Sequence, residues 1–148
     1  MLKKLFVIAL CAALLVTGTA PAQAAVGSVV VTTTVQNPSI TLYTIVWTSS
    51  AGGAVSGNTL GISNGDVFQI ETVPSTSAAP TDLYDMQLND SLGTVNVLGT
   101  AGDNLSATTS KIIQFVPAIY LDKSATFDLV ISNAGASKTG TVYVWVRR

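Results

Sequence analysis

The feature that most constrains the fold of this chain is an alternation of apolar and polar residues with a period of two, broken repeatedly by Gly, Pro, Ser and Asn. It runs through residues 26–36, which include "VVVTTTV", through "ITLYTIVWT" at 40–48, and through "DVFQIETV" at 66–73. Alternation puts apolar side chains on one face of a strand, and β-branched residues favour that conformation. Beyond the N-terminus no amphipathic pattern of helical length is present. The chain is therefore predicted to be all-β.

The second half of the chain continues this pattern. Strands are expected at 84–89, 111–119, 125–132 and 139–147. Residues 49–58 are expected to form a loop, with at most a short strand near Val55 or at 60–62. About eight short strands in a chain of this length predict a single antiparallel β-sandwich, Ig-like or jelly-roll-like.

The N-terminus is typical of a secretory signal peptide. Two lysines precede an apolar run from Leu5 to Val16, and Ala22-Gln23-Ala24 offers a small-x-small cleavage site. The run is shorter than the about 20 residues that a membrane span needs, so no membrane anchor is expected after cleavage. We predict that residues 1–24 are removed and that residues 25–148 form one exported domain, periplasmic or extracellular.

Composition narrows the chemistry of this domain. Histidine is absent, and the single cysteine, Cys11, lies within the predicted leader. The usual general base and any thiolate nucleophile or thiolate metal ligand are therefore missing. After residue 24, five basic residues stand against eight acidic ones, which disfavours an interface with nucleic acid. We expect no enzyme activity, no cofactor and no nucleic-acid partner.

One acidic stretch raises the question of a metal site. "TDLYDMQLNDSLGTVNVLG" at 81–99 holds Asp82, Asp85 and Asp90 within ten residues, and Asp103 follows in the next loop. These aspartates are the weak candidates for a calcium site, which needs about six to eight converging oxygen atoms. They would converge only if the next loop folded back.

The same stretch also fits a β-hairpin. Tyr84, Met86 and Leu88 fall on one face of a strand, residues 90–93 supply a turn, and apolar alternation resumes at 95–97. This arrangement accounts for nearly every residue of the stretch. We therefore favour a hairpin with a solvated acidic face over a metal site.

Aromatic pairs lie on alternate positions of two predicted strands, Tyr43 with Trp47 and Tyr143 with Trp145. Such pairs form either a flat surface for sugar rings or part of a sandwich core, and large aromatic side chains favour the core. "VVVTTTV" does not recur at a fixed period, which favours a solvated strand over a repeat array.

The closing strand has no face that is obviously made for water. Val142, Val144 and Val146 alternate with Tyr143 and Trp145. A strand in a two-layer sandwich needs only one apolar face. The second face is therefore expected to meet a loop, another subunit or a ligand.

A resemblance is carried by turn and strand positions in the second half of the chain. These positions are Tyr84-Asp85, Asp90, Gly93, Val97-Leu98-Gly99, Pro117, Asn133 and Gly135. With "AGDNLSATT" and the closing "SNAGASKTGTVYVWVR", this pattern resembles small β-sandwich proteins encoded among the structural genes of tailed bacteriophages. The resemblance implies a virion-associated structural role and no catalytic residues. A signal peptide departs from that pattern, because virion proteins assemble in the cytoplasm.

Taken together, these patterns predict an exported, non-catalytic structural or interaction protein. Its expected partner is another protein or a second copy of itself. The first alternative is a carbohydrate-binding or adhesive module that uses the four aromatic residues. The second is a small outer-membrane β-barrel, which shares the signal peptide and the alternating strands.

Overall fold

A computed structural model describes residues 26–62, 64–90, 95–121 and 126–148. The signal peptide predicted for residues 1–24 lies outside these ranges. Most of the turn predicted at 90–93 also lies outside them.

The described residues form seven β-strands and one short 3-10 helix, η1, and they contain no α-helix. The strands are β1 (Ser28–Asn37), β2 (Ile40–Thr48), β3 (Gly65–Pro74), β4 (Asp85–Asp90), β5 (Lys111–Leu121), β6 (Phe127–Ser132) and β7 (Thr139–Arg147), and η1 spans Gly99–Gly102. The all-β prediction is confirmed.

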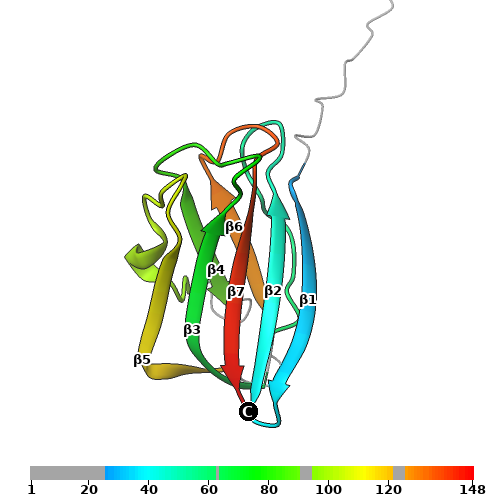
Figure 1. Ribbon diagram of the computed structural model, residues 1–148, viewed down its shortest axis with the longest axis vertical. Coiled ribbons are helices and arrows are strands. Elements are labelled where there is room, and N and C mark those ends of the chain that lie inside the picture. The colour runs from blue at the N-terminus through cyan, green and yellow to red at the C-terminus, as the bar shows by residue number, and fades with distance from the viewer. Residues whose placement is uncertain (1–25, 63, 91–94, 122–125) are drawn as a thin grey trace, which may run out of the picture.

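All strand pairs are antiparallel, and they make two separate sheets (Figure 1). The larger sheet has the order β1-β2-β7-β3-β5, and the smaller sheet pairs β4 with β6. The edges of the larger sheet, β1 and β5, are not paired with each other. In the part of the chain that the structure describes, the sheet is thus open, and the closed outer-membrane barrel considered from the sequence is wrong.

Alternation in sequence becomes alternation in burial on the central strands. Every second side chain of β2 and of β7 is buried, including Ile45 and Val144, which are fully shielded from solvent. Gly140 of β7 leaves room for the Trp47 ring, because a Cβ atom there would stand 2.6 Å from Cζ2 of that ring. β2 and β7 form where they were predicted because the two-residue period of their apolar side chains matches the set of side chains that the core buries.

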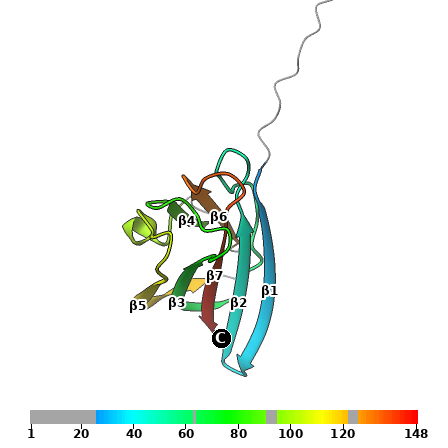
Figure 2. The same ribbon diagram turned by 45° about the horizontal axis from the view of Figure 1, so that its top comes forward.

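The core lies between the two sheets. From the smaller sheet, Met86 and Leu88 of β4 and Leu129 and Ile131 of β6 are each at most 1% exposed. They belong to one cluster of buried residues with the inward side chains of β2, β3 and β7. β4 and β6 lie behind β7 and β3 in Figure 1, and Figure 2 shows the same two layers from higher up.

The segment between β2 and β3 is irregular but buried. Val55 and Leu60 each form an isolated bridge to β6, and their side chains are at most 1% exposed. Between them, the Asn58 amide donates to the Leu129 carbonyl oxygen at 2.7 Å, and its oxygen accepts from the Leu129 N–H at 3.1 Å. The Asn58 side chain thus takes the place of one backbone pair between this segment and β6. Residues 49–62 therefore lie alongside β6 as an irregular third row of the smaller sheet.

β1 lies beyond the reach of the smaller sheet. None of its ten side chains is buried, although Val31 pairs with Ile45 of β2, which is fully buried. On the same inward side, Val35 is 69% exposed beside the buried Thr41. Both ribbon views place β1 at the end of the sheet farthest from β5, and β4 and β6 do not extend behind it. The core therefore reaches β1 only near its start, where the partly buried Val29 packs against the core cluster.

The hairpin predicted from the acidic stretch is only partly present. Its first strand is β4, with Met86 and Leu88 buried as expected, but the full partner of β4 is β6. One isolated bridge, Asn89 to Asn96, replaces the second strand. The Asn96 side chain explains this, because it accepts from the N–H of Leu88 at 3.2 Å and of Leu98 at 3.1 Å and thereby turns the chain into η1.

Candidate interaction surface

The side of the five-stranded sheet that faces away from β4 and β6 carries a grid of nine side chains, three on each central strand. By register, the rows across β2, β7 and β3 are Val46, Thr141 and Val73, then Thr44, Tyr143 and Glu71, and then Leu42, Trp145 and Gln69. We call these nine side chains the outer face. Figure 1 looks directly onto it, and no described segment crosses in front.

The outer face is partly exposed throughout. Val46 is 44% exposed, and the other eight side chains are half-buried against one another. Glu71 is the charged member of the set and lies opposite Tyr143. At one end, the exposed Arg147 pairs with Asp66 across β7 and β3 at 3.2 Å. The surface is therefore apolar and aromatic at its centre, with polar groups beside the rings.

Tyr143 and Trp145 are neighbours on this face, with ring centroids 5.8 Å apart and planes tilted by 43°. The other predicted pair is not part of it, because Tyr43 is 4% exposed and Trp47 is 1% exposed. Register explains the difference, since Tyr43 pairs with the inward-facing Val144. Placing Tyr43 and Trp47 on an interaction surface was therefore wrong, and the core reading of these two residues is correct.

The buried aromatics have their own contacts. The Trp47 ring lies 5.8 Å from the Tyr84 ring, and the Tyr84 hydroxyl is 3.5 Å from the hydroxyl of Thr72. Burial raises the pKa of the Tyr84 phenol, while the hydrogen bond to Thr72 lowers it by a smaller amount. These groups stabilise the core and are shielded from any partner.

The loop after β4 does fold back toward the acidic stretch, but the contacts are hydrogen bonds to backbone. Asp82 Oδ1 accepts from the N–H of Ala107 at 3.0 Å, and Asp85 Oδ1 accepts from the N–H of Asn104 at 2.9 Å. The second oxygen of Asp85 accepts from the Asn133 amide at 3.0 Å. These carboxylates hold loops together.

The remaining calcium candidates, Asp90 and Asp103, lie in different parts of the fold. Asp90 ends β4, and its N–H donates to the Val95 carbonyl oxygen at 2.9 Å, while Asp103 follows η1 and is exposed. Across the described ranges, no three carboxylate side chains lie close enough together to hold a metal ion. The four aspartates therefore support no metal proposal.

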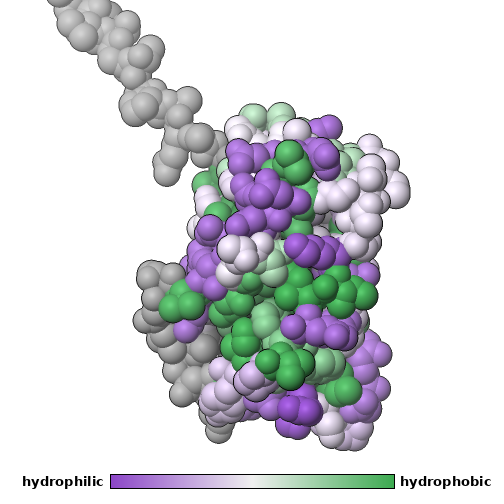
Figure 3. All heavy atoms as spheres, turned by 90° about the vertical axis from the view of Figure 1, so that its left-hand side faces the viewer, coloured by the Kyte–Doolittle hydropathy of each residue, from purple (hydrophilic) through white to green (hydrophobic). Residues whose placement is uncertain are grey.

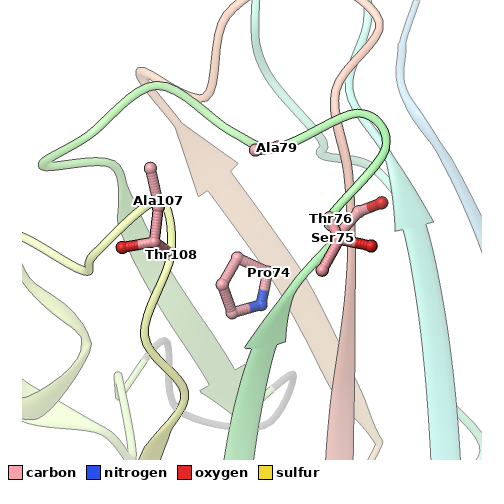
Figure 4. Close-up of a pocket in the computed structure, with 6 residues that line it drawn as sticks. All are labelled: Pro74, Ser75, Thr76, Ala79, Ala107 and Thr108. Atoms are coloured by element: carbon pink, nitrogen blue, oxygen red, sulfur yellow. The ribbon is translucent and has the colours of Figure 1, made fainter.

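A shallow hollow of about 200 Å³ opens where β3 ends (Figure 4). Pro74 lines it from the end of β3, Ser75, Thr76 and Ala79 from the segment after β3, and Ala107 and Thr108 from the segment before β5. No titratable side chain lines it, and it is smaller than the about 300 Å³ typical of small-molecule pockets. Its lining offers hydroxyl groups but no acid, base or nucleophile activated by a neighbour.

Both edges of the large sheet expose apolar side chains, which sequence reasoning did not single out. On β5, Ile112, Val116 and Tyr120 are 58%, 94% and 71% exposed, and hydrophobic atoms gather on that side of the molecule (Figure 3). On β1, Val30 and Val35 are 63% and 69% exposed. For β1 the sequence held one indication of this exposure. "VVVTTTVQN" is uncharged, so its pattern does not assign one face to the core and the other to solvent.

In comparisons with known proteins, no family model matches the chain, and no curated protein is significantly similar to it. As for membrane insertion, the described part of the chain holds no helix with the length and apolar character to cross a bilayer.

Proposed function

We propose that this protein is an exported, non-catalytic structural or interaction protein that binds a partner through the outer face. The observation that carries the proposal is the partly exposed Tyr143 and Trp145 pair, which lies on a sheet face that no described segment covers. Aromatic side chains are enriched at the centre of protein interfaces, where they bury a large area at small entropic cost.

The proposal also covers the type of β-sandwich and the evolutionary origin of the domain. Seven antiparallel strands in two layers around one core support an Ig-like or jelly-roll-like β-sandwich. The resemblance of residues 80–147 to phage-encoded sandwiches supports descent from a virion-associated module. The absence of histidine from the sequence and the lining of the hollow at the end of β3, which contains no acid or base, support a role without catalysis.

Export rests on the leader at residues 1–24. A cell that makes the full chain is expected to yield a periplasmic or extracellular form that begins at Ala25, because the small-x-small site directly follows the apolar run. N-terminal sequencing of the fractionated protein checks this, and an exported form that still begins at Met1 would contradict it.

Site-specific photocrosslinking in the source cells tests the outer face. A photoreactive phenylalanine at position 143 is expected to capture a partner, whereas the same group at position 83 is not. Leu83 is a matched control, because it is 60% exposed and apolar but lies outside the outer face. The product from position 143 should weaken when Trp145→Ala is added, while circular dichroism stays that of the parent. Equal capture at both positions, or none, contradicts the proposal.

Carbohydrate binding is the second candidate, favoured by the ring pair and by Gln69 and Glu71 on the adjacent strand, which offer hydrogen bonds to hydroxyl groups. Because the chain has two tryptophans, Trp47→Phe leaves Trp145 as a reporter of the outer face. If soluble polysaccharides bind there, they will shift the fluorescence of this variant. An unchanged spectrum across polysaccharide classes removes this candidate.

A further inference from the structure

We infer that β1 is the contact strand of a symmetric dimer, in which a second copy of this chain pairs antiparallel with β1 and extends the five-stranded sheet. This inference rests on the proposed contact function and names both a partner and a second site. The site is the free edge of β1, on the opposite side of β2 from the centre of the outer face.

The first support is the exposure of a long free edge. β1 is hydrogen-bonded to β2 on one side and to no described strand on the other. About half of its backbone N–H and C=O groups therefore point away from the sheet. An edge with this exposure is a template for another strand, and natural proteins usually block it with charges, proline or bulges.

β1 lacks most of these blocks, and β5 has them. Ser28–Asn37 contains no charged residue and no proline, and its one irregularity lies at the far end, between Val35 and Asn37. β5 starts with Lys111 and contains Pro117, which has no N–H to donate. Its register with β3 also jumps from Ile119 to Gln114. Of the two edges, β1 is the one left open to a strand.

The second support is that β1 matches itself. A two-fold axis perpendicular to the sheet keeps each side chain on the same face in both copies, and in an antiparallel pair this places the axis midway between the two copies of one residue. With the axis at Thr32, Val30 lies opposite Thr34 of the partner, and Val29 lies opposite Val35. Every such pair is uncharged, and β-branched residues pair with β-branched residues across most of the contact.

The third support is the apolar side of β1 that the core does not cover. Val31 and Val35 point to the core side of the sheet but are 38% and 69% exposed, because β4 and β6 do not reach them. In the dimer these valines meet the same strip of the partner. A charged partner strand would place charges beside them, whereas a second copy places Val29 opposite Val35 and the β-branched Thr33 opposite Val31.

A charge exchange at one residue pair tests both the partner and the register. Val30→Lys/Thr34→Lys puts two like-charged pairs across the axis, and Val30→Lys/Thr34→Glu puts two opposite-charged pairs there. By sedimentation equilibrium, the first variant is expected to dimerise at least about tenfold more weakly than the second. Ile112→Lys on β5 is the control, because Ile112 is similarly exposed on the other edge, and it should leave dimerisation unchanged.

Cysteine trapping gives a second measurement with mild substitutions. In a Cys11→Ser background, Thr32→Cys should form an intermolecular disulfide on oxidation, since the axis places the two side chains opposite each other. Thr44→Cys is the matched control: it is the next residue along the same row, and its two copies would lie about 14 Å apart, too far for a disulfide.

Three outcomes overturn the inference: a parent that stays monomeric over the whole concentration series, equal dimerisation by both charge variants, and equal trapping at positions 32 and 44. The proposed function fails separately. Crosslinking from position 143 in a strictly monomeric protein would preserve it, whereas dimerisation without such crosslinking would leave only the β1 contact.

Discussion

β1 and the segment at residues 49–62 show that regular structure and burial are distributed independently in this protein. β1 is a ten-residue strand with an uninterrupted ladder over most of its length, yet none of its side chains is buried. Residues 49–62 form no strand, yet Val55, Leu60 and Ile62 are among the most buried residues of the molecule. The irregular segment stabilises the fold, and the regular strand presents a surface.

The largest difference is expected from truncating a buried side chain of the irregular segment. Leu60→Ala leaves a cavity between the two sheets and should lower the free energy of unfolding by about 2–5 kcal/mol. Urea denaturation monitored by circular dichroism measures this. A loss below about 1 kcal/mol would mean that the segment is not part of the cooperative core, and the comparison with β1 would fail.

A smaller loss is expected at Asn58, where hydrogen bonds rather than packing connect the segment to β6. Asn58→Ala leaves both backbone groups of Leu129 without this partner and should cost about 1–3 kcal/mol. Asn58→Asp is the matched control, because it keeps an acceptor for the Leu129 N–H but loses the donor, and it should repel the carbonyl oxygen. Equal stability of all three proteins would show that the amide contributes nothing.

The pH dependence of unfolding gives a further test of how much a buried side chain, Tyr84, stabilises the fold. Its folded-state pKa is raised by burial, so its contribution to stability is present below about pH 10 and is lost as pH rises through the folded value. At neutral pH, Tyr84→Phe should cost about 1 kcal/mol, because the buried Thr72 hydroxyl loses its partner. Denaturation at neutral and alkaline pH should show this difference shrinking above about pH 10. A constant difference contradicts the assignment.

The smallest effect is expected on β1. Val35→Ala removes two methyl groups from a side chain that is 69% exposed and should change the free energy of unfolding by less than about 0.5 kcal/mol. The measurement is made at a concentration where the chain is monomeric, so that dimer contacts do not contribute. A cost comparable to that of Leu60→Ala would show that β1 is covered by something the described residues do not include.

Much of the fold could be predicted because alternation and burial coincide on the central strands. β2 and β7 have the bounds predicted for them, and the inward face of β4 is the predicted one. The second strand of the hairpin could not be excluded from sequence, because its alternation is intact. The Asn96 side chain redirects the chain through three-dimensional contacts that no local pattern contains.

Of the four aromatic residues predicted for an interaction surface, only two lie on the outer face. Tyr143 and Trp145 lie on the outer face, while Tyr43 and Trp47 lie in the core, although each pair falls on a single face of its strand. A period of two separates the faces of a strand but does not say which face meets the other sheet. Only the register between β2 and β7 decides it. For the same reason, the sequence does not reveal that β1 extends past the smaller sheet.

The position of the two ends of the described chain has a mechanical consequence. Register places Ser28, Thr48 and Thr139 at one end of the large sheet, and Asn37, Ile40 and Arg147 at the other. The chain thus enters β1 and leaves β7 at opposite ends (Figure 1). Tension between Val26 and Arg148 pulls β1 along its own length against β2, perpendicular to the hydrogen bonds that join them. All nine residue pairs of that ladder bear the load together, so the domain resists stretching by shear rather than opening one bond at a time.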